Sequence, residues 1–169
     1  MFNQSRVHRQ RGTTLIEVLV SMLLLAVAVI GFAALQVRAL TTTNTAVYRA
    51  QAVGIAQELA EKMRANYSQL AAYRGANWDA LPAQDCQAGV CTPAEMVSYD
   101  IRSSKMLAAA ALPNGNVAAR PCAAVNSLVC IYVSWNETTT ANTGAVNACG
   151  ATSGSYAGLA AECVIMEVY

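Results

Sequence analysis

The sequence is poor in the residues that enzymes and metal sites use. Its only histidine is His8, and it contains no Cys-x-x-Cys pair, Gly-rich phosphate loop or Gly-x-Ser-x-Gly elbow. Four acids, Asp79, Asp85, Glu95 and Asp100, would form a catalytic pair only if the fold happened to bring two of them together. We therefore expect no enzyme, no cofactor and no metal site.

Charge is scarce as well. Charged residues make up 12% of the chain and hydrophobic residues 55%, which indicates that part of the chain meets lipid or another chain. The formal net charge is +1, which argues against nucleic-acid binding driven by bulk charge. Arg6, Arg9 and Arg11 all precede Gly12, and no acid does. This cluster is typical of a membrane topology signal.

An uncharged run follows the arginines. Residues 18–35 contain one serine and no charge, and as a helix they would span about 27 Å, close to the roughly 30 Å hydrocarbon core of a bilayer. The preceding arginines place the N-terminus in the cytoplasm and the body outside. A cleaved secretory signal peptide is the alternative. Its apolar core would be shorter, and its cleavage site would follow the run, whereas the small-residue site Gly31-Phe32-Ala33 lies inside it.

The helical pattern continues beyond this run. No proline occurs before Pro82, so one helix is predicted from about Thr14 to about Asn66. Residues 41–45, TTTNT, either break that helix or mark the membrane interface. Further on, Glu58 and Lys62 form a favourable i,i+4 pair. An apolar stripe at helical spacing consists of Ala52, Ile55, Leu59 and Met63.

The second half contains all six cysteines. They are Cys86, Cys91, Cys122, Cys130, Cys149 and Cys163. An even number beyond a membrane segment indicates disulfides formed in an oxidising compartment. Many pairings are possible, and pairing of consecutive cysteines is favoured because each pair would close a short local loop.

After a predicted loop-rich stretch at 67–91, the second half contains one clear helix signal. Thr92 is a predicted N-cap, Pro93 suits the first helical position, and Glu95 completes a capping box. The helix should end near Ala111, before the turn signal Pro-Asn-Gly at 113–115.

The C-terminal third has a β pattern. Residues 128–135 predict a strand, with 116–123 as its hairpin partner, which would bring Cys122 near Cys130. Residues 136–158 indicate an exposed loop, and 163–169 a last strand. The body is therefore predicted to be an α+β unit, with a long helix against a small antiparallel sheet.

The N-terminal residues carry a family resemblance. Arg-Gly, then Thr-Thr-Leu-Ile-Glu-Val-Leu-Val and a long apolar run resemble the class III signal of type IV prepilins. In that family a prepilin peptidase cuts after the glycine and methylates the new N-terminal amine. The resemblance implies cleavage between Gly12 and Thr13, N-methylation of Thr13, and an assembly role for Glu17. Thr13 departs from the Phe or Met that the family usually has there.

Glu17 also has a physical reason to be where it is. A carboxylate close to lipid is costly unless a cation reaches it. Cleavage after Gly12 creates an α-amine that is largely protonated at neutral pH, either on the same chain at Thr13 or on a neighbouring subunit. Such a pair would set the axial register of helices, because a misplaced subunit leaves a buried charge unpaired. The alternative is a Glu17 that reaches the headgroups or stays protonated.

A second resemblance concerns the body. CTPAEMVSYDI, then LPNG, then a strand ending in Trp are similar to the PilV-type minor pilins. This implies a pilin-like fold and a subunit of a tip or priming complex that starts pilus assembly. Together with the class III signal and the apolar run, the predicted organisation is a cleaved leader at 1–12, a transmembrane and assembly half of the helix at 13–40, and a periplasmic domain at 41–169. The implied partners are prepilin peptidase, the inner membrane, other minor pilins and the major pilin.

Two other functions share parts of this pattern. A type II secretion pseudopilin would have the same N-terminal helix, but pseudopilins are often poor in cysteine, so six cysteines favour a pilus. A tip adhesin remains an alternative. For DNA binding we would expect an exposed basic patch, and residues 136–158 contain no Lys or Arg.

Overall fold

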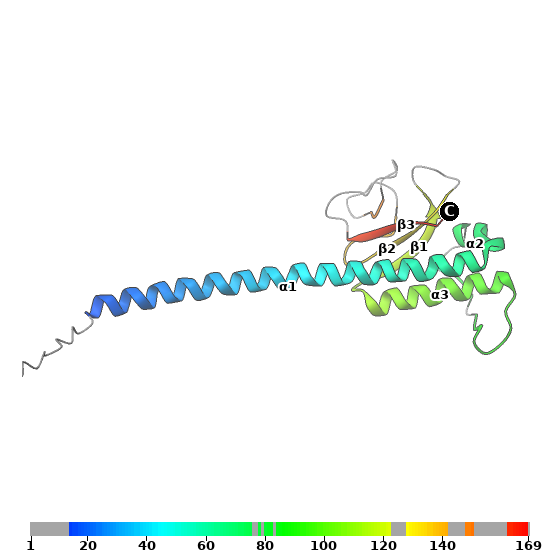
Figure 1. Cartoon of the computed structure of the whole chain (residues 1–169). Helices are drawn as coiled ribbons and strands as arrows, with labels where there is room; N and C mark the ends of the chain where they lie inside the picture. Colours follow the sequence, from blue (N-terminus) through cyan, green and yellow to red (C-terminus); the bar gives the residue numbers. More distant parts are fainter. Residues whose placement is uncertain are drawn as a thin grey trace, which may run out of the picture. The chain divides into compact units, whose positions relative to one another are not determined.

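The computed structural model describes residues 14–75, 78, 80–82, 84–122, 128–141, 148–150 and 162–168. The chain forms two compact units, Met1–Thr43 and Asn44–Tyr169. Helix α1, Leu15–Ala65, contributes residues to both (Figure 1). Its bounds agree to within one residue with the predicted helix from Thr14 to Asn66.

The Thr-rich stretch does not interrupt α1. The hydroxyls of Thr41 and Thr42 donate to the backbone carbonyl of Arg38 over 2.9 and 3.0 Å, and that of Thr43 donates to the carbonyl of Ala39 over 2.9 Å. These threonines satisfy their hydroxyl donors within the helix itself, which is how such residues are accommodated in a helix interior. Of the two predictions for this stretch, the helix break is wrong.

The part of α1 in the second unit buries one face. The predicted stripe is confirmed and is widened by two alanines. The buried residues are Ala52, Ile55, Ala56, Leu59, Ala60 and Met63. Beside this face, Lys62 Nζ lies 2.7 Å from Glu58 Oε1, as the i,i+4 spacing predicts. Small residues alternate with large ones on this face, so neighbouring elements can approach closely.

Helix α3, Pro93–Ala111, begins with the predicted capping box. The backbone N–H of Glu95 donates to Thr92 Oγ1 over 3.3 Å, and that of Thr92 donates to Glu95 Oε2 over 2.8 Å. The turn that ends the helix requires glycine, because a Cβ on Gly115 would lie 2.1 Å from the carbonyl oxygen of Ala108. Figure 1 shows α3 alongside the C-terminal half of α1.

The predicted loop-rich stretch at residues 67–91 begins with helical structure that the sequence did not indicate. This segment contains a 3₁₀ helix, Tyr67–Gln69, and helix α2, Leu70–Gly75. Tyr73 of α2 is fully buried. A helix of six residues is too short to give a periodic sequence signal, and tertiary packing around Tyr73 stabilises it instead.

The sheet has three antiparallel strands in the order β1-β2-β3. They are β1, Asn116–Pro121; β2, Val129–Ser134; and β3, Cys163–Glu167. Arg120 pairs with Cys130 in the β1–β2 register, and Ser134 with Cys163 in the β2–β3 register. The predicted hairpin and the predicted last strand are thus confirmed.

Both faces of β2 are buried, because its side chains alternate between two clusters. Val129, Ile131 and Val133 join the large core that also contains the buried face of α1. Cys130 and Tyr132 point to the opposite face. There they join a smaller cluster with Cys122, Cys149 and Cys163. The fold is therefore α+β, with the helix packed on a small antiparallel sheet.

Three disulfides join cysteines that are consecutive in the sequence, which is the pairing that the sequence favoured. They are Cys86–Cys91, Cys122–Cys130 and Cys149–Cys163. The second fastens β1 to β2, and the third fastens β3 to residues outside the sheet.

The exposed loop predicted at 136–158 is wrong for its described residues near 140 and 149. Thr140, Ala148 and Cys149 are buried, and Thr139 and Ala148 form an isolated bridge. Thr, Asn, Gly and Ala indicate exposure by composition, but here the disulfide to Cys163 holds the segment against the sheet. Residues 142–147 and 151–158 lie outside the described part of the chain.

Candidate assembly segment

The N-terminal segment holds the residues that the motif singles out. Gly12 and Thr13, the expected cleavage and methylation positions, lie outside the described residues. Glu17 lies in the first turn of α1. The backbone N–H of Glu17 donates to the Thr14 carbonyl over 2.9 Å, and that of Val18 donates to the same carbonyl over 3.3 Å. An acid in this turn also interacts favourably with the helix dipole.

The side chains of this segment are uncovered in the single chain. All residues from 14 to 47 are exposed, including Leu15 at 79% and Ile30 at 69%. The helix is long and apolar enough to cross a membrane, and no part of its most apolar window is buried. A contiguous apolar surface of this extent requires lipid or other helices around it. This criterion alone is also met by signal sequences, so the flanking residues decide its meaning.

Two opposite charges bound the apolar stretch. In the described part of the first unit, Glu17 and Arg38 are the only charged residues, and residues 18–37 between them carry none. Their side chains are exposed and take part in neither of the chain's two described ion pairs. The uncharged residues between them would span about 30 Å, which matches the hydrocarbon thickness of a bilayer.

The second unit contains a polar network around a buried acid that the sequence did not predict. Asp100 of α3 is only 5% exposed, and its carboxylate accepts a hydrogen bond from the hydroxyl of Tyr73 in α2. Asn66, just after α1, donates to Tyr73 over 3.4 Å and to the Pro93 carbonyl over 2.8 Å. Burial raises the pKa of both Tyr73 and Asp100. The network thus ties three helices together.

Each candidate catalytic acid that the structure describes accepts a hydrogen bond from a neighbouring group. Asp85 accepts from the backbone of Gln87 over 2.9 Å. The backbone hydrogen bond from Thr92 lowers the pKa of Glu95, and Asp100 belongs to the network above. Asp79 lies outside the described residues. No cluster of three or more metal-ligating side chains occurs in the part of the chain that the structure describes.

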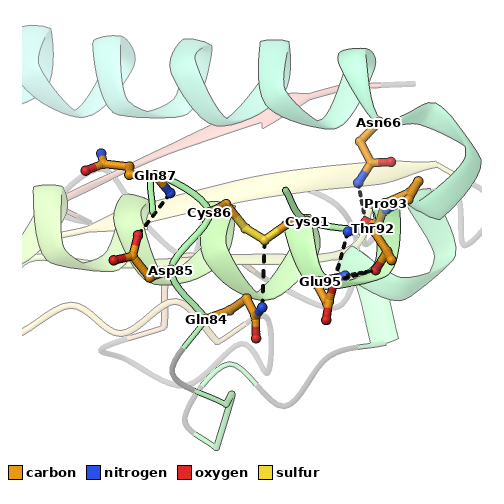
Figure 2. Close-up of a disulfide and its surroundings, with 9 residues drawn as sticks. All are labelled: Asn66, Gln84, Asp85, Cys86, Gln87, Cys91, Thr92, Pro93 and Glu95. Atoms are coloured by element: carbon orange, nitrogen blue, oxygen red, sulfur yellow. Dashed lines mark hydrogen bonds between the residues drawn. A yellow bond between two sulfur atoms is a disulfide. The ribbon is translucent and has the colours of Figure 1, made fainter. Parts of the chain in front are cut away.

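A cavity of about 350 Å³ lies where α1 ends and α3 begins. Its lining residues are Lys62, Ala65, Asn66, Cys91, Thr92, Pro93, Met96 and Asp100. Figure 2 shows the Cys86–Cys91 disulfide beside the first turn of α3, with Asn66 directed at Pro93. Lys62 Nζ donates to Ser103 Oγ over 2.9 Å and pairs with Glu58. Lys62 and Asn66 of this lining therefore bind to α3, which joins the end of α1 to α3.

Comparison with known proteins agrees with the N-terminal motif. Residues 7–33 match the family described as the prokaryotic N-terminal methylation motif. Residues 34–102 match the family described as type IV pilin Tt1218. No curated protein and no solved structure matches the chain. The PilV subtype suggested by the second half of the sequence therefore stays a prediction.

These families have consequences for processing and location. They imply cleavage by prepilin peptidase and assembly with other pilins. The motif and the exposed apolar helix fit anchoring in the inner membrane before assembly. Pilins are structural proteins. The two family matches, the apolar helix and the disulfide-linked α+β unit identify the chain as a type IV pilin with a class III signal motif.

Proposed function

We propose that this chain is a minor pilin that helps to initiate assembly of a type IV pilus and is incorporated at or near its tip. The observation that carries the proposal is the uncovered apolar helix with a single acid in its first turn. Such a helix does not complete its own packing, so it needs other helices once it leaves the bilayer. The order of sequence features in the body, which resembles minor pilins, supports the more specific role.

The proposed life cycle begins in the membrane. Arg6, Arg9 and Arg11 keep the leader, residues 1–12, in the cytoplasm. Residues 13–40 span the inner membrane, and residues 41–169 form the periplasmic domain. Prepilin peptidase cuts between Gly12 and Thr13 and methylates Thr13. The processed chain then enters the pilus and reaches the cell surface.

In this proposal, Glu17 sets the axial register of neighbouring helices. After cleavage, the α-amine of Thr13 lies four residues before Glu17, and the amine of an adjacent subunit can approach the same carboxylate. Out of the membrane, a subunit at the wrong height would leave a charge buried without a partner, which is strongly destabilising. A correctly placed subunit pairs carboxylate and ammonium by a charge-assisted hydrogen bond.

The three disulfides support a pilus subunit over a secretion pseudopilin. They staple the three strands that the structure describes and the start of α3. Closing these loops restricts the unfolded chain, which suits a domain that works outside the cell. Secretion pseudopilins, by contrast, are often poor in cysteine.

The proposal is tested by locating the chain in filaments. The full chain is expressed with its pilus system, and filaments are counted and immunogold-labelled with and without it. A priming subunit predicts far fewer filaments in its absence, of normal width, and label confined to filament ends in its presence. Label distributed along the shaft in proportion to filament length would instead assign the chain to the pilus body.

A further inference from the structure

The spacing of two charges in α1 suggests a second contact in assembly. Glu17 and Arg38 have opposite sign, lie at opposite ends of an uncharged stretch, and have no ion-pair partner in the described chain. Their separation of 21 residues along α1 corresponds to about 31 Å along the helix axis. A second copy shifted by that amount would place its Arg38 beside the first copy's Glu17.

Glu17 and Arg38 need such partners once the helix leaves the membrane. In the bilayer, both charges lie at the boundaries of the hydrocarbon, where headgroups and water solvate them. In a bundle of helices that solvation is lost, and a charge without a partner becomes costly. Arg38 has no acid near it in the sequence of the first unit other than Glu17, at the far end of the same stretch.

We propose that Arg38 of one copy pairs with Glu17 of a second copy displaced along the helix axis by about 31 Å. The inference rests on the proposed function, because it requires the helix to assemble outside lipid. A guanidinium can bind a carboxylate with two parallel hydrogen bonds, and the carboxylate retains acceptor sites for an α-amine. The contact is head-to-tail, so it does not close, and two copies stacked near the filament end are enough to form it.

A carbodiimide crosslink tests the contact directly. The full chain with Arg38→Lys keeps the positive charge and adds an amine that can be joined to a carboxylate in contact. Filaments are prepared from mixed ¹⁴N and ¹⁵N chains, treated with carbodiimide, and analysed by mass spectrometry for peptides that join positions 17 and 38. Wild type, which has no lysine there, is the negative control. Arg49→Lys, at an exposed position further along α1, is the positional control.

The expected result is a 17–38 link between differently labelled chains in Arg38→Lys filaments only. Arg38→Gln should lower the amount of chain recovered in filaments at least about tenfold, with normal leader cleavage, while Arg49→Gln changes it little. If filaments form and Glu17 is joined only to the amine of Thr13, the pairing with Arg38 is wrong and the proposed function stands.

Two other results would also overturn the pairing. If no 17–38 link forms and Arg38→Gln instead releases the chain from the membrane, then Arg38 is a lipid-phosphate anchor. If the processed wild-type chain enters no filament, both this inference and the proposed function fail.

Discussion

The hydroxyl of Tyr73 donates a hydrogen bond to the carboxylate of Asp100, and both side chains are buried. The two residues come from α2 and α3 and are 27 positions apart in the chain. With Asn66 they form the polar centre of the junction among α1, α2 and α3. A buried carboxylate depends on such a donor, because its water has been removed.

Removing that donor should destabilise the domain. Tyr73→Phe leaves Asp100 buried without its hydroxyl partner, and we expect the free energy of unfolding to fall by about 1–3 kcal/mol. Urea unfolding followed by tryptophan fluorescence, to which the buried Trp78 and Trp135 both contribute, measures the change. Tyr99→Phe removes a hydroxyl that makes no hydrogen bond within the described part of the chain and is the matched control. Equal effects of the two changes would contradict a role for this pair.

The raised pKa of Asp100 makes stability depend on pH. Burial raises this pKa, against the opposing effects of the Tyr73 hydrogen bond and the Lys62 charge. The folded state therefore holds the proton to higher pH than the unfolded chain does. Asp100 consequently favours folding most strongly at low pH, and its contribution falls as the pH rises from about 4 through the raised folded pKa.

Asp100→Asn isolates this effect, because the amide oxygen can still accept from Tyr73 and does not titrate. The difference in unfolding free energy, wild type minus variant, should fall across that pH window and become constant above it. It is measured by urea unfolding at a series of pH values. A difference that stays constant, or that rises with pH, would show that Asp100 does not titrate as inferred.

The three disulfides should contribute unequally to stability. Replacing Cys149 and Cys163 by alanine opens a loop with a sequence separation of 14, and replacing Cys86 and Cys91 opens one of 5. Chain entropy predicts losses of about 3 and about 2 kcal/mol respectively. The Cys149–Cys163 pair also lies in a buried cluster, so its removal also costs packing energy. Thermal unfolding of both double variants checks the order, and the reverse order would contradict it.

Leader processing depends on the residue before the expected cut. Gly12→Ala should leave the chain uncleaved by prepilin peptidase, and hence longer by residues 1–12, whereas the wild type should lose them. Intact-mass measurement of the membrane-bound chain distinguishes the two forms. Gly31→Ala is the control, because nothing lies within 4 Å of a Cβ added there. A normal mature mass for Gly12→Ala would exclude this cleavage site.

The carboxylate of Glu17 should matter for assembly and not for processing. Glu17→Gln is expected to give a normally processed chain whose recovery with other pilins drops at least about tenfold, because no charge remains to pair with the amine. Co-purification from detergent-solubilised membranes measures this. Ser21→Ala, one turn further along α1, serves as the control. Unchanged co-purification of Glu17→Gln would contradict the register role.

Features that depend on local signals could be predicted from the sequence. The helix from Leu15 to Ala65, the capping box of Thr92 and Glu95, the turn at Gly115 and the hairpin of β1 and β2 all follow from periodicity, capping chemistry or turn residues. The N-terminal motif also identified the family, because its residues are adjacent in the chain. The candidate assembly segment was predictable for the same reason.

Other features depend on contacts that form only when the chain folds. Helix α2 forms because Tyr73 packs against other elements, and its six residues are too few to show a period. Asp100 is an acid in mid-helix that gives no sequence sign of burial, and its partner comes from another helix. Thr140 and Cys149 are covered in a segment whose composition indicates exposure, because a disulfide ties it to β3. These features depend on contacts between residues that are distant in the sequence. Such contacts cannot be predicted from local composition.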